Sequence, residues 1–489
     1  MSNNDKDFVR EITSREEDAS QWYVDVIRKA ELADYAPVRG CMVIRPYGFA
    51  IWENIQQGLD RRIKETGHQN ACFPLFIPEG LLQKEADHVE GFAPEVAWVT
   101  HGGNEKLQER LAIRPTSEAI ICAMYSKWIK SYRDLPVLIN QWVNVVRWEK
   151  VTRPFLRTTE FLWQEGHTAH RTNEEAQEEV LSMLEVYRDF VETDMAVPVL
   201  TGRKSDKEKF AGAEATYCIE ALMLDGKALQ AGTSHNLAQH FAKVFGIEYL
   251  DEDGQLKYVH QTSWGVSTRL MGALVMVHGD DRGLKIPPKI APIQVVIVPI
   301  APKNKREMVL EKAAELRTQL KQTGIRVHLD DREEHTPGYK YNDWEMRGVP
   351  LRLEVGPRDI ENSQVVLVRR DSGEKQFVPM AELNSTLEQL LPQIQQDMFE
   401  TAKKFRSSNS SGAATLDEME EIITSKRGFV YSWWCGGEEC EAAAKERMAA
   451  TIRCIPLDQE GAKEIAPKET KCFNCSTNSK EVAVFARAY

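Results

Sequence analysis

The chain has 489 residues, of which 42% are hydrophobic and 28% charged, and its formal net charge is −12. This length exceeds what one hydrophobic core organises, so about three domains are expected. No apolar run reaches the roughly 20 residues that a membrane span needs, and the charged N-terminus lacks the apolar stretch of a secretory signal. We therefore expect a cytoplasmic globular protein with no membrane partner. The negative charge says little about nucleic acids, because local basic patches decide those contacts.

Composition divides the chain into three regions. Residues 1–288 mix strand-like apolar runs with long amphipathic stretches. Residues 289–400 open with the β-branched run 294–300, and amphipathic and apolar stretches follow it, which predicts a small α/β domain with a partly parallel sheet. Residues 401–489 begin with the Ser-rich stretch 407–412, predicted to be a flexible linker or loop, and continue as a cysteine-bearing tail.

The first polar constellation is the segment Arg114-Pro115-Thr116-Ser117-Glu118. Its hydroxyl and carboxylate, two positions apart, can both accept hydrogen bonds from one small cationic group. A Thr or Ser ahead of an apolar stretch is also a favoured helix N-cap, and capping preferences alone favour that structural interpretation. The two interpretations are compatible.

The second constellation spans residues Arg147 to Glu165. Arg147 is followed two positions later by Glu149, and after a short loop come Arg157, Phe161 and Glu165. An arginine fork suits a phosphate, a carboxylate on the same strand face can accept from an adenine amino group, and an aromatic ring offers a platform for the base. A surface ion pair of Arg147 with Glu149 is the structural alternative, and it would contribute little. The full spacing favours a nucleotide site.

Two later segments add polar groups. Residues 230–236 read Gln-Ala-Gly-Thr-Ser-His-Asn, and residues 265–274 place Arg269 where a polar run leads into an apolar helix. A lone arginine at the start of a helix is usually structural, so a functional role for Arg269 is supported only together with the other segments. An arginine over an aromatic face contributes about 0.5–2 kcal/mol.

Together these segments resemble the class II aminoacyl-tRNA synthetases, and among them the class IIa prolyl-tRNA synthetases of the eukaryote/archaeal-like type. Residues 147–165 resemble motif 2, residues 265–274 motif 3, and residues 67–74 the looser motif 1, which builds the dimer interface in that family. Thr268 stands where the class-wide pattern has Glu, as in the prolyl branch. The resemblance covers residues 35–489. It implies a homodimeric ligase that activates L-proline with ATP and transfers it to tRNA(Pro).

The resemblance also implies the site residues. For ATP, with Mg²⁺, they are Arg147, Glu149, Arg157, Thr158, Phe161, Gln230, Thr233, Ser267 and Arg269. For proline they are Thr116, Glu118, Arg147, Trp163, His167 and His235. Arg147 and Arg269 are the expected catalytic pair. No general base is assigned, because a carboxylate with a pKa near about 3.5 is already ionised at neutral pH.

Two further sites are expected in the second and third regions. Residues 337–350 resemble the class IIa anticodon-binding domain, which implies anticodon contacts from Lys340, Glu345 and Arg347. A helix carrying ordinary surface charges is the equally supported alternative. In the tail, two close cysteine pairs predict a tetrahedral Zn²⁺ site, with unpaired thiols as the alternative. The four cysteines are Cys435, Cys440, Cys472 and Cys475.

The implied fold is α+β. We expect a catalytic domain built on an antiparallel sheet of six or seven strands (1–288), an α/β anticodon-binding domain (289–400) and a small zinc-bearing α+β domain (401–489). The stretch 165–265 leaves no room for an inserted editing domain. A sister synthetase, such as one for threonine, and a non-catalytic tRNA-binding paralogue are the alternatives. The Thr-x-Glu segment argues against the first, and the complete set of charged ATP contacts argues against the second.

Overall fold

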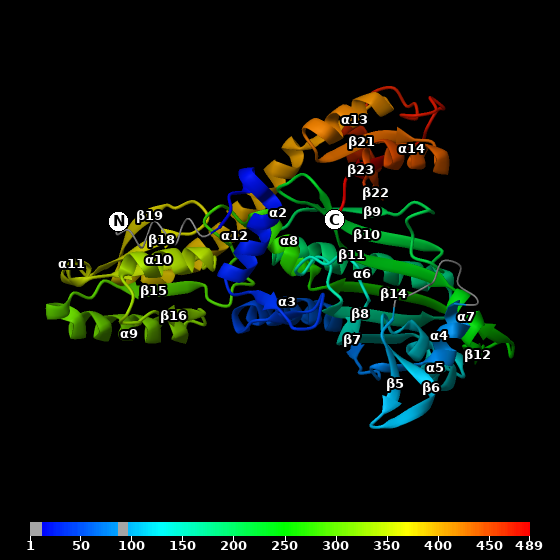
Figure 1. Cartoon of the computed structure of the whole chain (residues 1–489), viewed down its shortest axis with the longest axis horizontal. Helices are drawn as coiled ribbons and strands as arrows, with labels where there is room; N and C mark the ends of the chain where they lie inside the picture. The colour runs from blue at the N-terminus through cyan, green and yellow to red at the C-terminus, as the bar shows by residue number, and fades with distance from the viewer. Residues whose placement is uncertain (1–11, 87–95) are drawn as a thin grey trace.

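The computed structural model describes residues 12–86 and 96–489. Figure 1 shows three parts: a central β-rich body, an α/β unit in yellow-green at the left, and an orange-to-red C-terminal unit above the central strands. No helix in the described part of the chain is both long and apolar enough to cross a membrane.

An 11-stranded sheet runs through the central body into the C-terminal unit, in the order β20-β21-β23-β22-β9-β10-β11-β14-β8-β7-β3. The seven strands of the central body are β3 (Gln69–Asn70), β7 (Val137–Val146), β8 (Glu160–His170), β9 (Val199–Arg203), β10 (Ala215–Leu222), β11 (Ala228–Ala238) and β14 (His260–Ser267). Six of them pair antiparallel, and the short β3 pairs parallel to β7. The expected class II sheet is confirmed.

Helices cover this sheet because their apolar residues recur at helical spacing. α6 (Asn173–Thr193) begins at a capping box formed by Thr172 and Glu175, and it packs against β11 and β14. α8 (Arg269–His278) is buried almost all round. The other helices and 3₁₀ turn of the central body are α2 (Arg15–Lys29), α3 (Pro46–Glu65), α4 (Glu79–Ala86), α5 (Glu118–Trp128), α7 (His240–Phe245) and η1 (Tyr132–Asp134).

Smaller sheets border the central one. They are formed by β1 (Ala33–Tyr35) with β2 (Met42–Ile44), by β4 (Phe76–Pro78), β6 (Glu105–Ile113) and β5 (Trp98–Gly102), and by β12 (Glu248–Leu250) with β13 (Leu256–Tyr258). The β4-β6-β5 sheet leads directly into the segment before α5, so it positions the Thr116 region at the cavity described below.

The second unit has a five-stranded sheet in the order β16-β15-β17-β18-β19. β15 pairs parallel with β16 and β17, and the remaining pairs are antiparallel, which confirms the predicted partly parallel α/β fold. Its strands are β15 (Val295–Pro299), β16 (Val327–Leu329), β17 (Leu351–Val355), β18 (Gln364–Arg369) and β19 (Lys375–Pro379). Its helices are η2 (Lys303–Lys305), α9 (Arg306–Gln322), α10 (Pro337–Met346), α11 (Pro357–Glu361), η3 (Met380–Glu382) and α12 (Leu383–Ser408).

The prediction of a flexible linker at residues 407–412 is wrong. Ser407 and Ser408 end α12, and Ser410–Gly412 form β20, which pairs parallel with β21. The Ser410 hydroxyl donates to the Arg406 carbonyl (2.8 Å), so a polar side chain here caps a helix end. The C-terminal unit also contains α13 (Leu416–Ser425), β21 (Phe429–Trp434), α14 (Glu438–Met448), β22 (Thr451–Pro456), α15 (Gln459–Ile465) and β23 (Glu481–Ala486).

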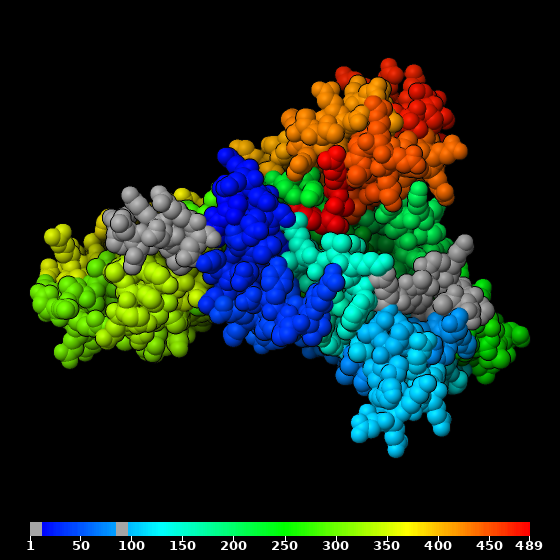
Figure 2. Space-filling model, viewed as in Figure 1, coloured from blue at the N-terminus to red at the C-terminus, as the bar shows by residue number. Residues whose placement is uncertain are grey.

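The C-terminal unit is joined to the central body by backbone pairing. β22 pairs antiparallel with β9 through Ile455 and Pro456, opposite Arg203 and Gly202. In Figure 2 the orange and red atoms lie directly against the green atoms of the central body.

Candidate active site

A cavity of about 310 Å³ lies over β8, β11 and β14. Successive residues of a strand point to opposite faces, and along β8 alternate residues line the cavity, whereas β11 and β14 also contribute consecutive residues. The lining includes all six residues predicted for proline: Thr116, Glu118, Arg147, Trp163, His167 and His235. It includes six of those predicted for ATP, namely Arg147, Phe161, Gln230, Thr233, Ser267 and Arg269, whereas Glu149, Arg157 and Thr158 lie outside it.

The hydroxyls of Thr116 and Ser117 do not cap α5. The Thr116 hydroxyl donates to the Glu118 carboxylate, and the Ser117 hydroxyl donates to Glu165 Oε1 (2.5 Å). Ser117 occupies the N-cap position without a side-chain capping bond. The capping interpretation of this segment is therefore not realised by either hydroxyl, and both side chains turn toward carboxylates instead.

Glu118, Glu165 and His167 form a buried corner of the cavity, where each offers one ligand atom within 4.8 Å of the others. His167 Nε2 lies 3.0 Å from Glu165 Oε2, and the Gln141 amide donates to Glu165 Oε1 (2.7 Å). Burial disfavours the charged forms, but the hydrogen bond between the two residues outweighs it: the pKa of His167 is raised and that of Glu165 is lowered. This corner is suited to a small cation.

Arg147 lies beside this corner. Its Nε donates to the Pro115 carbonyl (3.0 Å), and its guanidinium lies 5.6 Å from the Phe161 ring centroid and 5.2 Å from that of Trp163. Burial lowers the pKa of Arg147, while the charges of Glu118 and Glu165 oppose that change. The predicted alternative, a surface ion pair with Glu149, is not formed.

A group of arginines borders the other end of the cavity. Arg269 is the first residue of α8, and its guanidinium donates to the carbonyls of Leu156 (3.3 Å) and Gln230 (3.4 Å). Burial, followed by the charges of Arg147 and Arg157, lowers the pKa of Arg269 to about 10. Such crowding of positive charge favours a bound anion.

Besides Arg147, three residues predicted for ATP lie in the loop between β7 and β8: Glu149, Arg157 and Thr158. Arg157 Nε is 3.5 Å from Glu149 Oε2, with the Arg157 side chain 59% exposed, so it is free to turn toward a ligand. In the same loop, the Thr158 hydroxyl donates a hydrogen bond to the Glu160 carbonyl (2.8 Å).

His235 is held between two threonines. Its Nδ1 lies 3.0 Å from Thr216 Oγ1 and its Nε2 3.0 Å from Thr233 Oγ1, and its ring lies 4.8 Å from that of Phe210. Burial, followed by repulsion from His167, lowers its pKa to about 3. His235 therefore stays neutral at physiological pH.

The sequence motifs contained Glu165 without giving it a ligand, and they missed another part of the lining: Glu208, Phe210, Thr216, Ser263 and Trp264. Ser263 could have been found from strand alternation, because it stands two positions from another lining residue. Glu208 and Phe210 belong to a loop that has no periodic pattern, so only the tertiary fold reveals them.

The three residues predicted for the anticodon are bound within the protein. Lys340 is buried and its ammonium donates to the Asp330 carbonyl (2.9 Å). Arg347 pairs with Asp343 (3.1 Å) and Glu31 (2.7 Å), and Glu345 accepts from a neighbouring arginine. Their role in anticodon recognition stays a prediction. It requires that these side chains leave their partners within the protein and contact tRNA instead.

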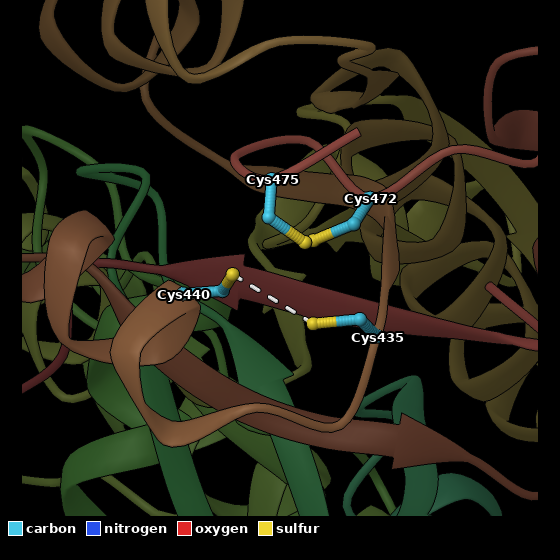
Figure 3. Close-up of side chains that lie close together, drawn as sticks. All are labelled: Cys435, Cys440, Cys472 and Cys475. Carbon is cyan, nitrogen blue, oxygen red and sulfur yellow. Dashed lines mark hydrogen bonds between the residues drawn. The ribbon is translucent and has the colours of Figure 1, made fainter. Parts of the chain in front are cut away.

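Four cysteines gather in the C-terminal unit, with their sulfur atoms within 4.8 Å of one another. Figure 3 shows them pointing toward one another from two separate segments. Cys435 follows β21 and Cys440 is in α14, while Cys472 and Cys475 precede β23. The backbone N–H of Gly437 donates to Cys435 Sγ (3.4 Å), and the Asn474 amide donates to Cys440 Sγ (3.5 Å). Four converging sulfurs with such donors around them fit a tetrahedral zinc ion.

The sheet, the cavity and the arginine arrangement define a class II aminoacyl-tRNA synthetase. Residues 98–278 match the family model of the tRNA synthetase class II core domain (G, H, P, S and T), and residues 294–390 match the anticodon binding domain. Residues 416–489 match the C-terminal domain of prolyl-tRNA synthetase.

Whole-chain relatives agree with these matches. The chain is 66% identical to the proline–tRNA ligase of Natranaerobius thermophilus and 59% identical to that of Alkaliphilus oremlandii, in both cases over 100% of each chain. A crystal structure of prolyl-tRNA synthetase from Cryptosporidium parvum, complexed with halofuginone and AMPPNP, matches with a TM-score of 0.92 and 44% identity over 98% of this chain and 99% of that one. The chain belongs to the prolyl-tRNA synthetases, the class II ligases that join proline to its tRNA.

Proposed function

We propose that the cavity binds L-proline at the corner formed by Thr116, Glu118, Glu165 and His167, and binds ATP toward Arg269. The observation that carries this assignment is a buried anionic corner directly beside the Arg147 guanidinium. The proline ammonium has two N–H groups. Because the Thr116 hydroxyl already donates to Glu118, its lone pairs are left to accept one of them, and Glu118 accepts the other. Arg147 then faces the proline carboxylate.

In the activation step, the proline carboxylate oxygen attacks the α-phosphate of ATP in line. The bond to the leaving pyrophosphate breaks, and prolyl-adenylate forms. No base is needed, so catalysis consists of positioning and of stabilising charge that develops on phosphate oxygens, chiefly by Arg147 and Arg269. The 3′-hydroxyl of tRNA(Pro) then attacks the adenylate carbonyl and releases AMP.

For the nucleotide, Phe161 supplies a ring for adenine, and Arg269 covers its other face. Glu149 accepts from the adenine amino group, and Arg157 reaches the phosphates once it leaves Glu149. Thr158, Gln230, Thr233 and Ser267 complete the proposed set. Mg²⁺ bound with ATP supplies further charge neutralisation near Gln230. The AMPPNP in the Cryptosporidium parvum complex supports a nucleotide site in this fold.

ATP–pyrophosphate exchange across the twenty amino acids tests this assignment. We expect proline to give the highest exchange, Glu118→Gln to raise the KM for proline, and Arg147→Ala to reduce exchange by about 100- to 1000-fold, because it removes charge stabilisation in the transition state. Arg133→Ala, an exposed arginine outside the cavity, is the control. Exchange by Arg147→Ala within a few-fold of wild type, with unchanged circular dichroism, would contradict the assignment.

We further infer a homodimer formed along β3, the last strand of the central sheet. An edge strand offers unpaired backbone groups to a partner, and the nearby Phe76 is 45% exposed. Light scattering should give twice the 55.7 kDa of one chain. A mass of one chain at micromolar concentration would contradict the dimer.

The remaining parts of the proposal concern organisation. The domain limits 1–288, 289–400 and 401–489 follow the order of the family matches, although α12 runs across residue 400.

The proposed anticodon contacts are made by Lys340, Glu345 and Arg347. One structural Zn²⁺ is proposed to be held by Cys435, Cys440, Cys472 and Cys475. None of the nine cysteines, which all lie in the described part of the chain, forms a disulfide, and this suits a reducing compartment such as the cytoplasm. We assign the chain to the eukaryote/archaeal-like type without an editing insertion, because residues 165–265 are taken up by α6, α7 and strands of the central body.

A further inference from the structure

A loop that none of the motifs explains forms one wall of the cavity. It spans residues 204–210, directly after β9, and its Glu208 and Phe210 line the cavity. The Phe210 N–H donates to Thr216 Oγ1 (2.9 Å), and its ring lies 4.8 Å from that of His235. The position of this loop therefore sets the shape of the proposed proline site.

Ser205 fixes the turn of this loop. Its carbonyl accepts from the N–H groups of Glu208 (3.1 Å) and Lys209 (3.0 Å), and its hydroxyl oxygen lies 3.3 Å from the same Glu208 nitrogen. The hydroxyl proton is donated to Glu441 Oε1 (2.8 Å). Ser205 is 1% exposed and Glu441 3% exposed, so this is a buried, charge-assisted hydrogen bond between the loop and α14.

The residue before Ser205 is anchored to the same C-terminal unit. The Lys204 ammonium donates to Glu220 Oε1 (2.8 Å) and to the carbonyl of Arg453 on β22 (2.6 Å). The Arg453 guanidinium in turn donates to Glu220 (3.0 and 3.1 Å). Two successive loop residues are thus held by two elements of the C-terminal unit, α14 and β22, although no residue of that unit lines the cavity.

We propose that the C-terminal unit positions the wall of the amino-acid pocket, with Glu441 and Ser205 as positioning residues that hold Glu208 and Phe210 in place. This inference rests on the proposed assignment of proline to the cavity. A loop that is already ordered spares the entropy of ordering it when the amino acid binds. Loss of the Glu441 contact therefore weakens proline binding, while ATP, bound at the other end of the cavity, is little affected.

Exchange kinetics test this separation of the two substrates. We expect Glu441→Ala and Ser205→Ala each to raise the KM for proline about tenfold, the effect of losing one buried charge-assisted hydrogen bond, and to leave the KM for ATP within about twofold. Glu441→Gln keeps an acceptor oxygen and should recover most of the affinity. The double variant should be no worse than either single variant, because both remove the same bond. Glu446→Gln, an exposed carboxylate on the same helix, is the matched control.

Limited trypsin digestion gives a second readout that does not depend on where proline binds. Lys207 is exposed in the loop, so cleavage there, followed by mass spectrometry, should be faster in Ser205→Ala and Glu441→Ala than in wild type or Glu446→Gln. Unchanged cleavage together with an unchanged KM for proline would overturn the inference. So would equal increases in both KM values with a lowered melting temperature, which indicate general destabilisation. If Glu118→Gln leaves the KM for proline unaltered, the pocket assignment itself fails, and the cleavage rates still decide whether α14 holds the loop.

Discussion

At the scale of single residues, two histidines in one cavity have pKa values shifted in opposite directions. Burial disfavours the charged form of His167, but its hydrogen bond to Glu165 and the nearby charge of Glu118 together raise its pKa. Burial dominates at His235, which has no carboxylate bonded to it among the described residues, and repulsion from His167 adds to the effect, so its pKa falls to about 3. Both directions depend on burial in the folded chain, and on contacts such as that of Glu118 with His167, so the motifs predicted both histidines for the pocket but not the direction of either pKa shift.

The two histidines predict opposite dependences of stability on pH. Below about pH 6.5 the unfolded chain protonates His235 and the folded chain does not, so the free energy of unfolding should fall with decreasing pH by up to about 1.4 kcal/mol per pH unit. For His167 the folded chain holds the proton more tightly, so its contribution is present below about pH 6.5 and is lost as the pH rises through its raised pKa.

Urea unfolding at a series of pH values measures both effects. The difference between wild type and His235→Gln should change on the acid side of about pH 6.5, and the difference between wild type and His167→Gln on the alkaline side. Difference curves that are flat with pH, or that change on the same side, would contradict the directions of the two pKa shifts.

At the scale of elements, the sequence predicted segments with a recognisable side-chain pattern. It missed segments whose form depends on contacts with residues far away in the chain. The β-branched run 294–300 predicted the strand β15 to within one residue at each end. The Ser-rich stretch at 407–412 looked like a linker because its strand, β20, is defined by pairing with β21 rather than by its own side chains. The loop 204–210 has no periodicity at all, and its form depends on contacts with residues more than 200 positions away.

Close packing between β8 and β14 gives an element-scale prediction. Gly166 lies opposite Trp264, and a Cβ at Gly166 would stand 2.2 Å from the indole ring. Gly166→Ala should therefore displace Trp264, which lines the cavity, and lower the free energy of unfolding by about 1–3 kcal/mol. Gly102→Ala, where the nearest atom is 3.4 Å away, is the control and should be close to neutral. Urea unfolding and the KM for proline measure the two effects, and equal behaviour of the two variants would contradict this packing argument.

At the scale of the whole molecule, the central sheet does not stop at the catalytic part. β9 and β22 join the two units through backbone bonds, and the buried Glu220 is shared between Lys204 and Arg453 across the junction. The cysteine spacing predicted a zinc site, and the composition predicted that the tail is a separate domain. It gave no sign of the shared sheet, since pairing between strands about 250 residues apart leaves no local pattern.

The proposed zinc site predicts metal content and stability. Protein purified without chelator should carry about one zinc per chain, and Cys435→Ser and Cys472→Ser should lose it and melt at a lower temperature. Cys454→Ser changes a buried thiol outside the four-cysteine cluster and should keep its zinc. Metal analysis with thermal unfolding checks both points. No zinc in the wild-type protein, or full zinc in the two cluster variants, would contradict the site.

The size of the proposed proline pocket and the organisation of the whole chain together predict how this enzyme treats alanine. A pocket shaped for proline cannot strongly exclude a smaller amino acid, since each missing methylene is worth only about 1–3 kcal/mol. An editing domain of about 100 residues or more would need a separate body between β8 and β14, where the described chain instead forms the sheet and its covering helices.

We therefore expect measurable alanine-dependent exchange and no hydrolysis of mischarged tRNA. Preformed Ala-tRNA(Pro) is mixed with the purified enzyme, and deacylation is followed against a control without enzyme. The two rates should coincide. Faster hydrolysis than in the control, abolished by changing a residue outside the 310 Å³ cavity, would contradict the prediction and reveal a second hydrolytic site.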